Sequence, residues 1–137
     1  MTYVKSFRDL EVYKLSRELS KEIFQISKSS FPKEEMYSLT DQIRRSSRSV
    51  GAQISEAWAK RKYEKHFISK LTDADGEQQE TQHWIETALD CNYLNESTVK
   101  NLLERYASVG KMINSMIKKA SQFCSQKTNH QSPITDN

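Results

Sequence analysis

The side chains best suited to chemistry in this sequence are basic ones gathered in residues 44–62. They are Arg44, Arg45, Arg48, Lys60, Arg61 and Lys62. Arg44 and Arg48 are four residues apart, and Ser55 and Lys62 follow at steps of seven, so one helix would carry all four on one face with Arg45 beside them. Guanidinium and ammonium groups bind phosphate oxygens by charge and hydrogen bonding. This face therefore predicts contact with RNA or DNA phosphates.

Three interpretations of the basic face remain open: a solvated surface, a phosphate-contacting surface, and a surface that pairs with acidic residues. The third arises because residues 64–95 reverse the charge, with seven carboxylates against Lys65 and Lys70. Those carboxylates are Glu64, Asp73, Asp75, Glu77, Glu80, Glu86 and Asp90. The acidic partner would lie in the same chain or in a neighbouring copy. The net charge of +3 is too small to decide among them.

Two short motifs resemble metal sites but lack the remaining ligands. Glu80 and His83 form one Glu-x-x-His step, whereas a carboxylate-bridged di-iron bundle needs two such steps and further glutamates. The Asp-x-Asp-Gly run that ends at Gly76 resembles part of a calcium loop. The corresponding ligand positions before and after it are Leu71 and Gln82, which carry no carboxylate. We therefore expect no metal site here.

Catalysis also lacks a candidate constellation. With three scattered glycines the chain has no glycine-rich phosphate loop, and no serine or cysteine lies in a recognisable nucleophile motif with a histidine and an acid. For a chain of 137 residues, which has room for one domain, this pattern predicts a protein that is not an enzyme and that needs no cofactor.

The elements that must position the basic residues are helices. Apolar residues recur every three or four positions over 9–29, 33–60, 63–93 and 96–124, with Asp9 as the expected N-cap of the first helix. Short turns separate them, so the sequence predicts an all-α fold: an antiparallel up-down-up-down four-helix bundle over residues 1–125 and a disordered polar tail over 126–137. The expected core includes Val12, Leu19, Ile23, Met36, Ile43, Ile54, Phe67, Leu71, Ile85, Leu102, Tyr106 and Ile113.

Two clusters of small or polar side chains have more than one interpretation. The middle of the helix expected over 33–60 carries small residues, suited either to close helix packing or to a surface kept low for a ligand: Ser46, Ser47, Ser49, Gly51, Ala52 and Ser55. The middle of the next helix is polar, and its side chains would either form hydrogen bonds across a subunit interface or lie in solvent: Gln78, Gln79, Thr81 and Gln82.

Composition bears on the compartment. No run approaches the roughly 20 apolar residues of a membrane span, and the first residues lack the apolar stretch of a signal peptide, so we expect a cytoplasmic protein with no membrane partner. Cys91 and Cys124 lack metal-site spacing and fall near opposite ends of the expected bundle. They are interpreted as two buried, reduced thiols.

Several motifs in order resemble one known family. These are Phe7-x-Asp9-Leu10-Glu11-Val12-Tyr13, Phe31-Pro32-x-Glu34-x-Met36-Tyr37-x-Leu39-x-x-Gln42-Ile43-Arg44-Arg45-Ser46, Ser49-Val50-x-x-x-Ile54-x-Glu56 and Glu80-Thr81-Gln82-x-Trp84-Ile85-x-x-Ala88. Over residues 7–120 the chain resembles the four-helix-bundle proteins encoded in intervening sequences of bacterial 23S rRNA genes. It departs from that pattern at Ala57-Trp58, where many relatives have glycine.

This resemblance implies a homo-oligomer, commonly a pentameric ring. The family is also similar in fold to the accessory proteins of diversity-generating retroelements, which are associated with reverse transcriptase and nucleic acid. The family has no settled biochemical function. Two hypotheses follow: a homo-oligomeric bundle that binds RNA or other nucleic acid through the basic face, or a scaffold that organises a partner protein and binds no nucleic acid.

Overall fold

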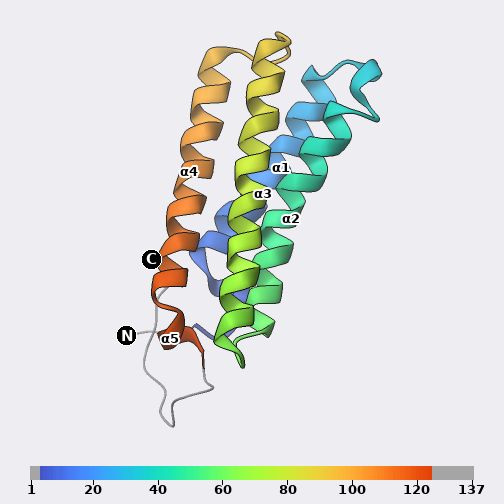
Figure 1. The fold of residues 1–137 in the computed structure, drawn as a ribbon. Coiled ribbons are helices and arrows are strands. Elements are labelled where there is room, and N and C mark those ends of the chain that lie inside the picture. The colour runs from blue at the N-terminus through green and yellow to red at the C-terminus, as the bar shows by residue number, and fades with distance from the viewer. Residues whose placement is uncertain (1–3, 125–137) are drawn as a thin grey trace.

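Four long helices form the part of the chain that the computed structural model describes, residues 4–124 (Figure 1). They are α1 (Glu11–Ser30), α2 (Leu39–Ala59), α3 (Glu64–Asp90) and α4 (Glu96–Lys118). Three short helices accompany them: the 3-10 helices η1 (Phe7–Asp9) and η2 (Lys33–Glu35), and the α-helix α5 (Ala120–Phe123). Successive long helices run in alternate directions in Figure 1. The predicted all-α four-helix bundle is confirmed, with no strand in the described chain. The tail expected over 126–137 lies outside the described residues.

The core is built from one buried stripe on each long helix. Its largest members, each almost fully buried, include Leu19, Ile23, Ile43, Ile54, Phe67, Leu71, Ile85, Leu102, Tyr106 and Ile113. The three- and four-residue spacing therefore identified the core-facing sides correctly. Because charged and polar residues cover the other sides, no helix within residues 4–124 is long and apolar enough to cross a membrane.

The first long helix begins two residues later than predicted, because Asp9 caps a different segment. Its carboxylate accepts hydrogen bonds from the backbone N–H groups of Lys5 and Ser6, at 3.3 and 3.1 Å. The Ser6 hydroxyl in turn accepts from the backbone N–H of Arg8 at 3.2 Å. These reciprocal bonds stabilise η1. The chain is extended at Leu10, and α1 starts at Glu11.

The helix expected over 33–60 is shorter than predicted at both ends. It is preceded by η2, and Met36, a predicted core residue, is 49% exposed in the turn between η2 and α2. The Glu35 carboxylate accepts from the backbone N–H of Leu39 at 3.1 Å and so caps α2. It also accepts from the Tyr93 hydroxyl at 2.8 Å, and this bond raises the pKa of Tyr93 to about 12. Glu35 thus joins the start of α2 to the α3–α4 turn.

The two cysteines lie at opposite ends of the bundle. The Phe123 ring stacks on Phe67 near the start of α3, with ring centroids 5.8 Å apart, and this contact places Cys124 at that end. Cys91 follows the last residue of α3 and so lies at the other end of that helix, which is roughly 40 Å long at the helical rise of ~1.5 Å per residue. Both thiols are free, but only Cys124 is buried, so the interpretation of two buried thiols is wrong for Cys91. Burial raises the pKa of Cys124 to about 11.

Candidate nucleic-acid interface

Two of the predicted arginines, Arg44 and Arg48, turn toward α1 and surround an aromatic ring there. The Phe24 ring on α1 has the Cζ atoms of Arg44 and Arg48 at 4.7 and 5.5 Å from its centroid, and the ammonium of Lys28 at 5.4 Å. Arg44 also donates from Nε to the Ser27 hydroxyl at 2.7 Å. Arg44 is therefore partly a packing residue, whereas the Arg48 side chain is exposed.

Arg45 faces the other way, toward α3. It donates to the Gln42 amide oxygen at 2.5 Å, and its guanidinium lies 3.9 Å from the Glu80 carboxylate. A second ion pair between the same two helices joins Lys70 to Glu56 at 3.2 Å. Pairing with an acidic helix of the same chain thus accounts for Arg45 and does not account for Arg44 or Arg48.

The basic run Lys60, Arg61 and Lys62 lies outside α2, because the helix ends at Ala59. The helical spacing that would have aligned Lys62 with Arg48 stops there. Lys60 is roughly 18 Å farther along the helix axis than Arg48 at ~1.5 Å rise per residue. The six predicted residues therefore do not share one surface. Arg44, Arg45 and Arg48 line one pocket of about 510 Å³ along α2, whereas Lys60, Arg61 and Lys62 lie beyond the end of that helix.

Within that run, Arg61 has a structural role. Its guanidinium stacks on the Trp58 ring, 3.7 Å from the centroid, and its Nε donates to the Trp58 carbonyl at 2.8 Å. Burial lowers the pKa of Arg61 below the ordinary value of an arginine. Lys60 and Lys62 are exposed at the α2–α3 turn.

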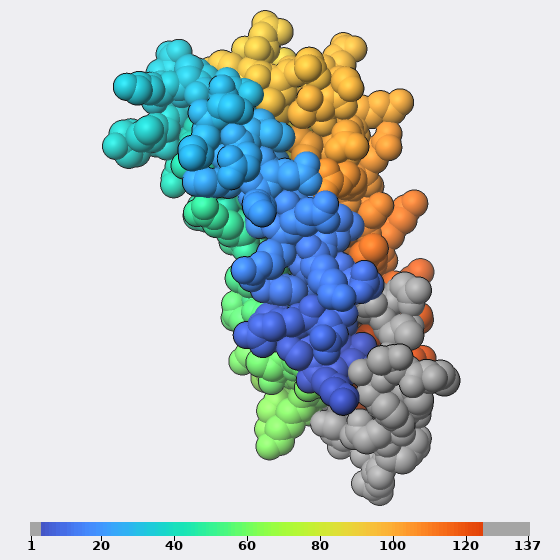
Figure 2. All heavy atoms as spheres, turned by 180° about the vertical axis from the view of Figure 1, so that it is seen from behind, coloured from blue at the N-terminus to red at the C-terminus, as the bar shows by residue number. Residues whose placement is uncertain are grey.

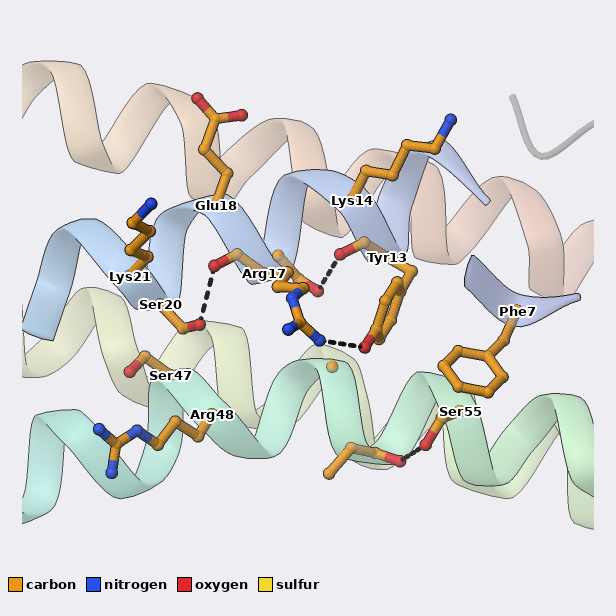
Figure 3. A pocket seen from close by; sticks show the side chains of 13 residues that line it. Phe7, Tyr13, Lys14, Arg17, Glu18, Ser20, Lys21, Ser47, Arg48 and Ser55 are labelled. Carbon is orange, nitrogen blue, oxygen red and sulfur yellow. Dashed lines mark hydrogen bonds between the residues drawn. The ribbon is translucent and has the colours of Figure 1, made fainter. Parts of the chain in front are cut away.

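The most prominent surface feature is a groove of about 750 Å³ between α1 and α2, here named the α1–α2 groove. In Figure 2, which shows the molecule from behind, α1 crosses this face between α2 and α4. The lining combines cations, two aromatic rings and small side chains: Phe7, Tyr13, Lys14, Ser16, Arg17, Glu18, Ser20, Lys21, Ser47, Arg48, Gly51, Ala52 and Ser55. Figure 3 shows the side chains in place.

The charges of the groove are largely uncompensated. Arg17 donates from Nη1 to the Tyr13 hydroxyl at 3.0 Å. Arg17, Lys21 and Arg48 form no ion pair within residues 4–124. The Glu18 carboxylate points away from α2 in Figure 3 and pairs with Arg105 of α4 at 3.1 Å. A groove with three uncompensated cations attracts anions, and phosphate oxygens match guanidinium groups in geometry.

The basic residues of α1 were missed when only the stretch 44–62 was considered. Arg17, Lys21 and Lys28 are separated by four and seven residues, and Lys14 precedes Arg17 by three. These are the same spacings that selected the arginines of α2. The signal was present in the sequence. That Arg48 of α2 meets Lys14, Arg17 and Lys21 of α1 along one groove depends on how α1 packs on α2.

The small residues of α2 lie on two different sides of the helix. Ser46 is fully buried against α3, where its hydroxyl lies 2.8 Å from that of Thr81. Gly51 faces α1, where an added Cβ would lie 3.3 Å from the Ser16 Oγ and 3.5 Å from Tyr13 Cε1. Close packing explains the side toward α3. On the other side, the small residues keep the floor of the α1–α2 groove low.

The polar side chains in the middle of α3 form hydrogen bonds within the same chain. Gln78, only 4% exposed, donates to Asp75 at 2.9 Å and accepts from Gln82 at 2.7 Å, and Gln79 donates to Asp75 at 3.2 Å. These residues line a second groove, between α3 and α4, of about 640 Å³. The amides predicted to lie either at a subunit interface or in solvent thus hydrogen-bond to one another, and Gln78 packs against α4.

The two motifs that resemble metal sites are ordinary helical surface. Glu80 accepts from the Trp84 indole N–H at 3.1 Å, and the His83 ring packs edge-on against Trp84 with centroids 4.7 Å apart. Gly76 lies inside α3 with open space where a side chain would be. Over residues 4–124, no group of three or more His, Cys, Asp or Glu side chains is placed to hold a metal ion.

The fold and groove together define a helical bundle with a basic groove between its first two helices. The family model of the 23S rRNA-intervening sequence proteins matches residues 8–115, and the chain belongs to this family. It is also similar to the crystal structure of a protein of unknown function from the S23 ribosomal protein family of Bacteroides thetaiotaomicron. The TM-score is 0.70 at 28% sequence identity, over 78% of this chain and 98% of that chain. No curated protein matches the chain.

Proposed function

We propose that this protein is a non-catalytic, homo-oligomeric bundle of the cytoplasm that binds RNA or other nucleic acid through phosphate contacts at the α1–α2 groove. The observation that carries the proposal is the set of uncompensated cations, Arg17, Lys21 and Arg48, on one groove. Arg44 and Lys28 extend the same positive surface around Phe24. The family name, which refers to intervening sequences in 23S rRNA, favours RNA as the first ligand to test.

The affinity should come mainly from release of counterions, and it should therefore fall steeply with salt. The test is fluorescence anisotropy with labelled RNA and DNA across a salt series. The variant Lys21→Ala/Arg48→Ala removes two exposed cations without touching the hydrogen bond that Arg44 makes to Ser27. We expect about tenfold weaker binding at low salt, and a salt slope smaller by roughly 0.7 for each lost contact on a single strand.

A matched control removes the same charge elsewhere. Lys100→Ala/Lys111→Ala takes two exposed lysines from α4, outside the α1–α2 groove. It should bind within about twofold of the wild type, since more distant exposed charges are screened. Equal weakening by both double variants would show that only net charge matters. Absence of binding at low salt by the assembled wild-type protein would refute the proposal.

A second candidate function is a protein-interaction scaffold that binds no nucleic acid. Tyr37 is 92% exposed and Met36 is 49% exposed beside it, and aromatic and methionine side chains are enriched in interfaces. The same pair would supply apolar surface for self-association, for which the family resemblance suggests a pentamer. Light scattering coupled to gel filtration tests this: Tyr37→Ser should lower the oligomer's mass, and a wild type that is monomeric at every concentration would refute self-association.

A further inference from the structure

The α1–α2 groove has two chemically different ends. Lys21 and Arg48 lie toward one end, the Phe7 ring lies at the other, and Arg17 and Tyr13 lie between them (Figure 3). A uniformly cationic surface would be enough for phosphate contacts alone. Aromatic rings open to a basic groove supply a different interaction, because nucleic-acid bases stack on them.

The rings and the cations are held at fixed positions relative to each other. The Tyr13 hydroxyl accepts from Arg17 Nη1 at 3.0 Å, so one guanidinium stays beside the ring. Phe7 packs edge-on against Tyr13 with centroids 4.9 Å apart and planes at 83°, which fixes the ring orientation. A phosphate-binding group and a stacking surface are thereby preorganised side by side, the order in which a nucleotide presents its phosphate and base.

The floor of the groove sets the size of the ligand. Gly51, Ala52 and Ser55 carry at most a small side chain along this face of α2, and a Cβ at Gly51 would come within 3.5 Å of the Tyr13 ring. The resulting volume of about 750 Å³ falls within the range of small-ligand pockets, roughly 300–1,000 Å³. This is room for one or two nucleotides with their bases turned in.

We propose that the α1–α2 groove accepts an unpaired nucleotide of a single strand, with its phosphate between Arg17, Lys21 and Arg48 and its base against Tyr13. The inference rests on the proposed function and deepens it by naming the form of nucleic acid. In a duplex the bases are stacked and paired, so only phosphates reach the cations. In a single strand the base is free to enter, and the site adds stacking to charge.

The experiment compares three ligands of equal length: a single-stranded RNA, the same sequence as a duplex, and an abasic strand that keeps the phosphates. Anisotropy titrations use the full-length protein at one low salt concentration. The single strand should bind about tenfold more tightly than the abasic strand, the effect of roughly one stacked base. The duplex also offers no free base, so its binding should depend on phosphate charge alone, which is denser than in a single strand.

Two variants test whether the base stacks inside the α1–α2 groove. Tyr13→Leu removes the ring, and Ser55→Leu fills the aromatic end of the groove while leaving every cation in place. Each should bind the single strand as weakly as it binds the abasic strand. Ser55→Leu, which leaves the hydrogen bond between Arg17 and Tyr13 intact, should also bind the abasic strand as the wild type does. Tyr63→Leu, which removes a 54% exposed ring outside the groove, is the matched control and should keep the tenfold preference. Thermal melts confirm that each variant is folded.

The outcomes separate this inference from the proposed function. If wild type binds all three ligands equally, and Lys21→Ala/Arg48→Ala weakens all of them, phosphate contact stands and the nucleotide site is wrong. The nucleotide site is also wrong if the folded Tyr13→Leu and Ser55→Leu variants both keep the tenfold preference. If wild type binds none of the three ligands, both proposals fail.

Discussion

The α1–α2 groove and the α3–α4 groove have the same plan and different chemistry. Each contains one glycine that makes room for a side chain of the neighbouring helix. In the α3–α4 groove, a Cβ at Gly110 would lie 2.8 Å from Gln78 Nε2 and 3.3 Å from Asp75 Oδ1. In the α1–α2 groove, a Cβ at Gly51 would lie 3.3 Å from the Ser16 hydroxyl. The space at Gly110 is filled by a hydrogen-bonded amide, and the space at Gly51 is filled by the Ser16 hydroxyl and the Tyr13 ring at ordinary or nearly ordinary contact distances.

The difference lies in how polar groups are satisfied. In the α3–α4 groove, amides and carboxylates bond to one another, and Asn114 donates to the Gly110 carbonyl at 2.9 Å. The α1–α2 groove instead places like charges together, which costs free energy in the isolated protein. An uncompensated set of cations is the arrangement that a polyanion relieves, and so we assign binding to the α1–α2 groove.

Helix α1 has an edge whose charges are paired and an edge whose charges are not. Its acidic edge faces α4, where Glu18 and Glu22 both receive hydrogen bonds from Arg105. Its basic edge, with Arg17 and Lys21, faces the α1–α2 groove. Charge pairing on one edge therefore leaves the other edge with an excess of positive charge.

The largest effect is expected where the packed groove is overfilled. Gly110→Ala forces the Gln78 amide to move, because 2.8 Å is closer than a carbon and a nitrogen can approach. The amide ends a flexible side chain, but it is buried, and its movement disturbs its hydrogen bonds with Asp75 and Gln82. The cost of overpacking, about 1–3 kcal/mol, should exceed the gain in helix propensity, for a net loss of about 1–2 kcal/mol. Chemical denaturation measures it. A stable Gly110→Ala variant would show that the α3–α4 groove is as loose as the other.

A second change tests whether the buried polar groups of α4 all have hydrogen-bond partners. Tyr106 of α4 is fully buried, and its hydroxyl finds no hydrogen-bond partner among residues 4–124. Burial raises the pKa of Tyr106, so the hydroxyl stays protonated. Tyr106→Phe removes a polar atom that makes no hydrogen bond and should stabilise the fold by about 1 kcal/mol in chemical denaturation. Destabilisation would mean that the hydroxyl is satisfied in solution.

Much of the fold was predictable because the apolar spacing of each helix reflects the core directly. Residues such as Ile43, Ile54 and Ile113 sit where that spacing put them. Helix ends were less predictable, since they depend on contacts distant in sequence. Glu35 caps α2 and bonds Tyr93, 58 residues away, and no local pattern reports that pair.

The candidate site was only half predictable, for a related reason. Spacing identifies which residues share a face of one helix, and it correctly associated Arg44 with Arg48. It does not say which neighbouring helix that face meets, so the contribution of Arg17 and Lys21 required the α1–α2 packing. The prediction also extended the helical spacing beyond Ala59, where α2 ends. Lys62 is therefore not part of this helix and does not lie on the face that the spacing predicted.

A third prediction concerns the paired edge of α1 and its response to acid. The hydrogen bond from Arg105 lowers the pKa of Glu22 below its ordinary value of 4.5. The pair therefore contributes stability above that ordinary value and loses it as pH falls through the lower, folded pKa. Because both partners are partly exposed, we expect about 0.5–1 kcal/mol. Denaturation at pH 7 and at low pH should show this loss in wild type, and Arg105→Ala should show less of it.

The smallest effect is expected at the floor of the open groove. Gly51→Ala brings a methyl group 3.3 Å from Ser16 Oγ, at the end of a short side chain, and 3.5 Å from Tyr13 Cε1, an ordinary contact. The steric cost is therefore small. Alanine gains roughly 0.5–1 kcal/mol over glycine inside a helix, so the free energy of unfolding should stay within about 0.5 kcal/mol of wild type.

The same variant sharpens the comparison with Gly110, since both changes add one methyl to a helix at a groove floor. Denaturation of the two variants under identical conditions should differ by more than about 1 kcal/mol, because the overpacking cost arises at Gly110 alone. Equal losses would mean that α1 packs on α2 as tightly as α3 packs on α4. The space between α1 and α2 would then be an incidental furrow, and the cations along it would be better explained as solvated surface.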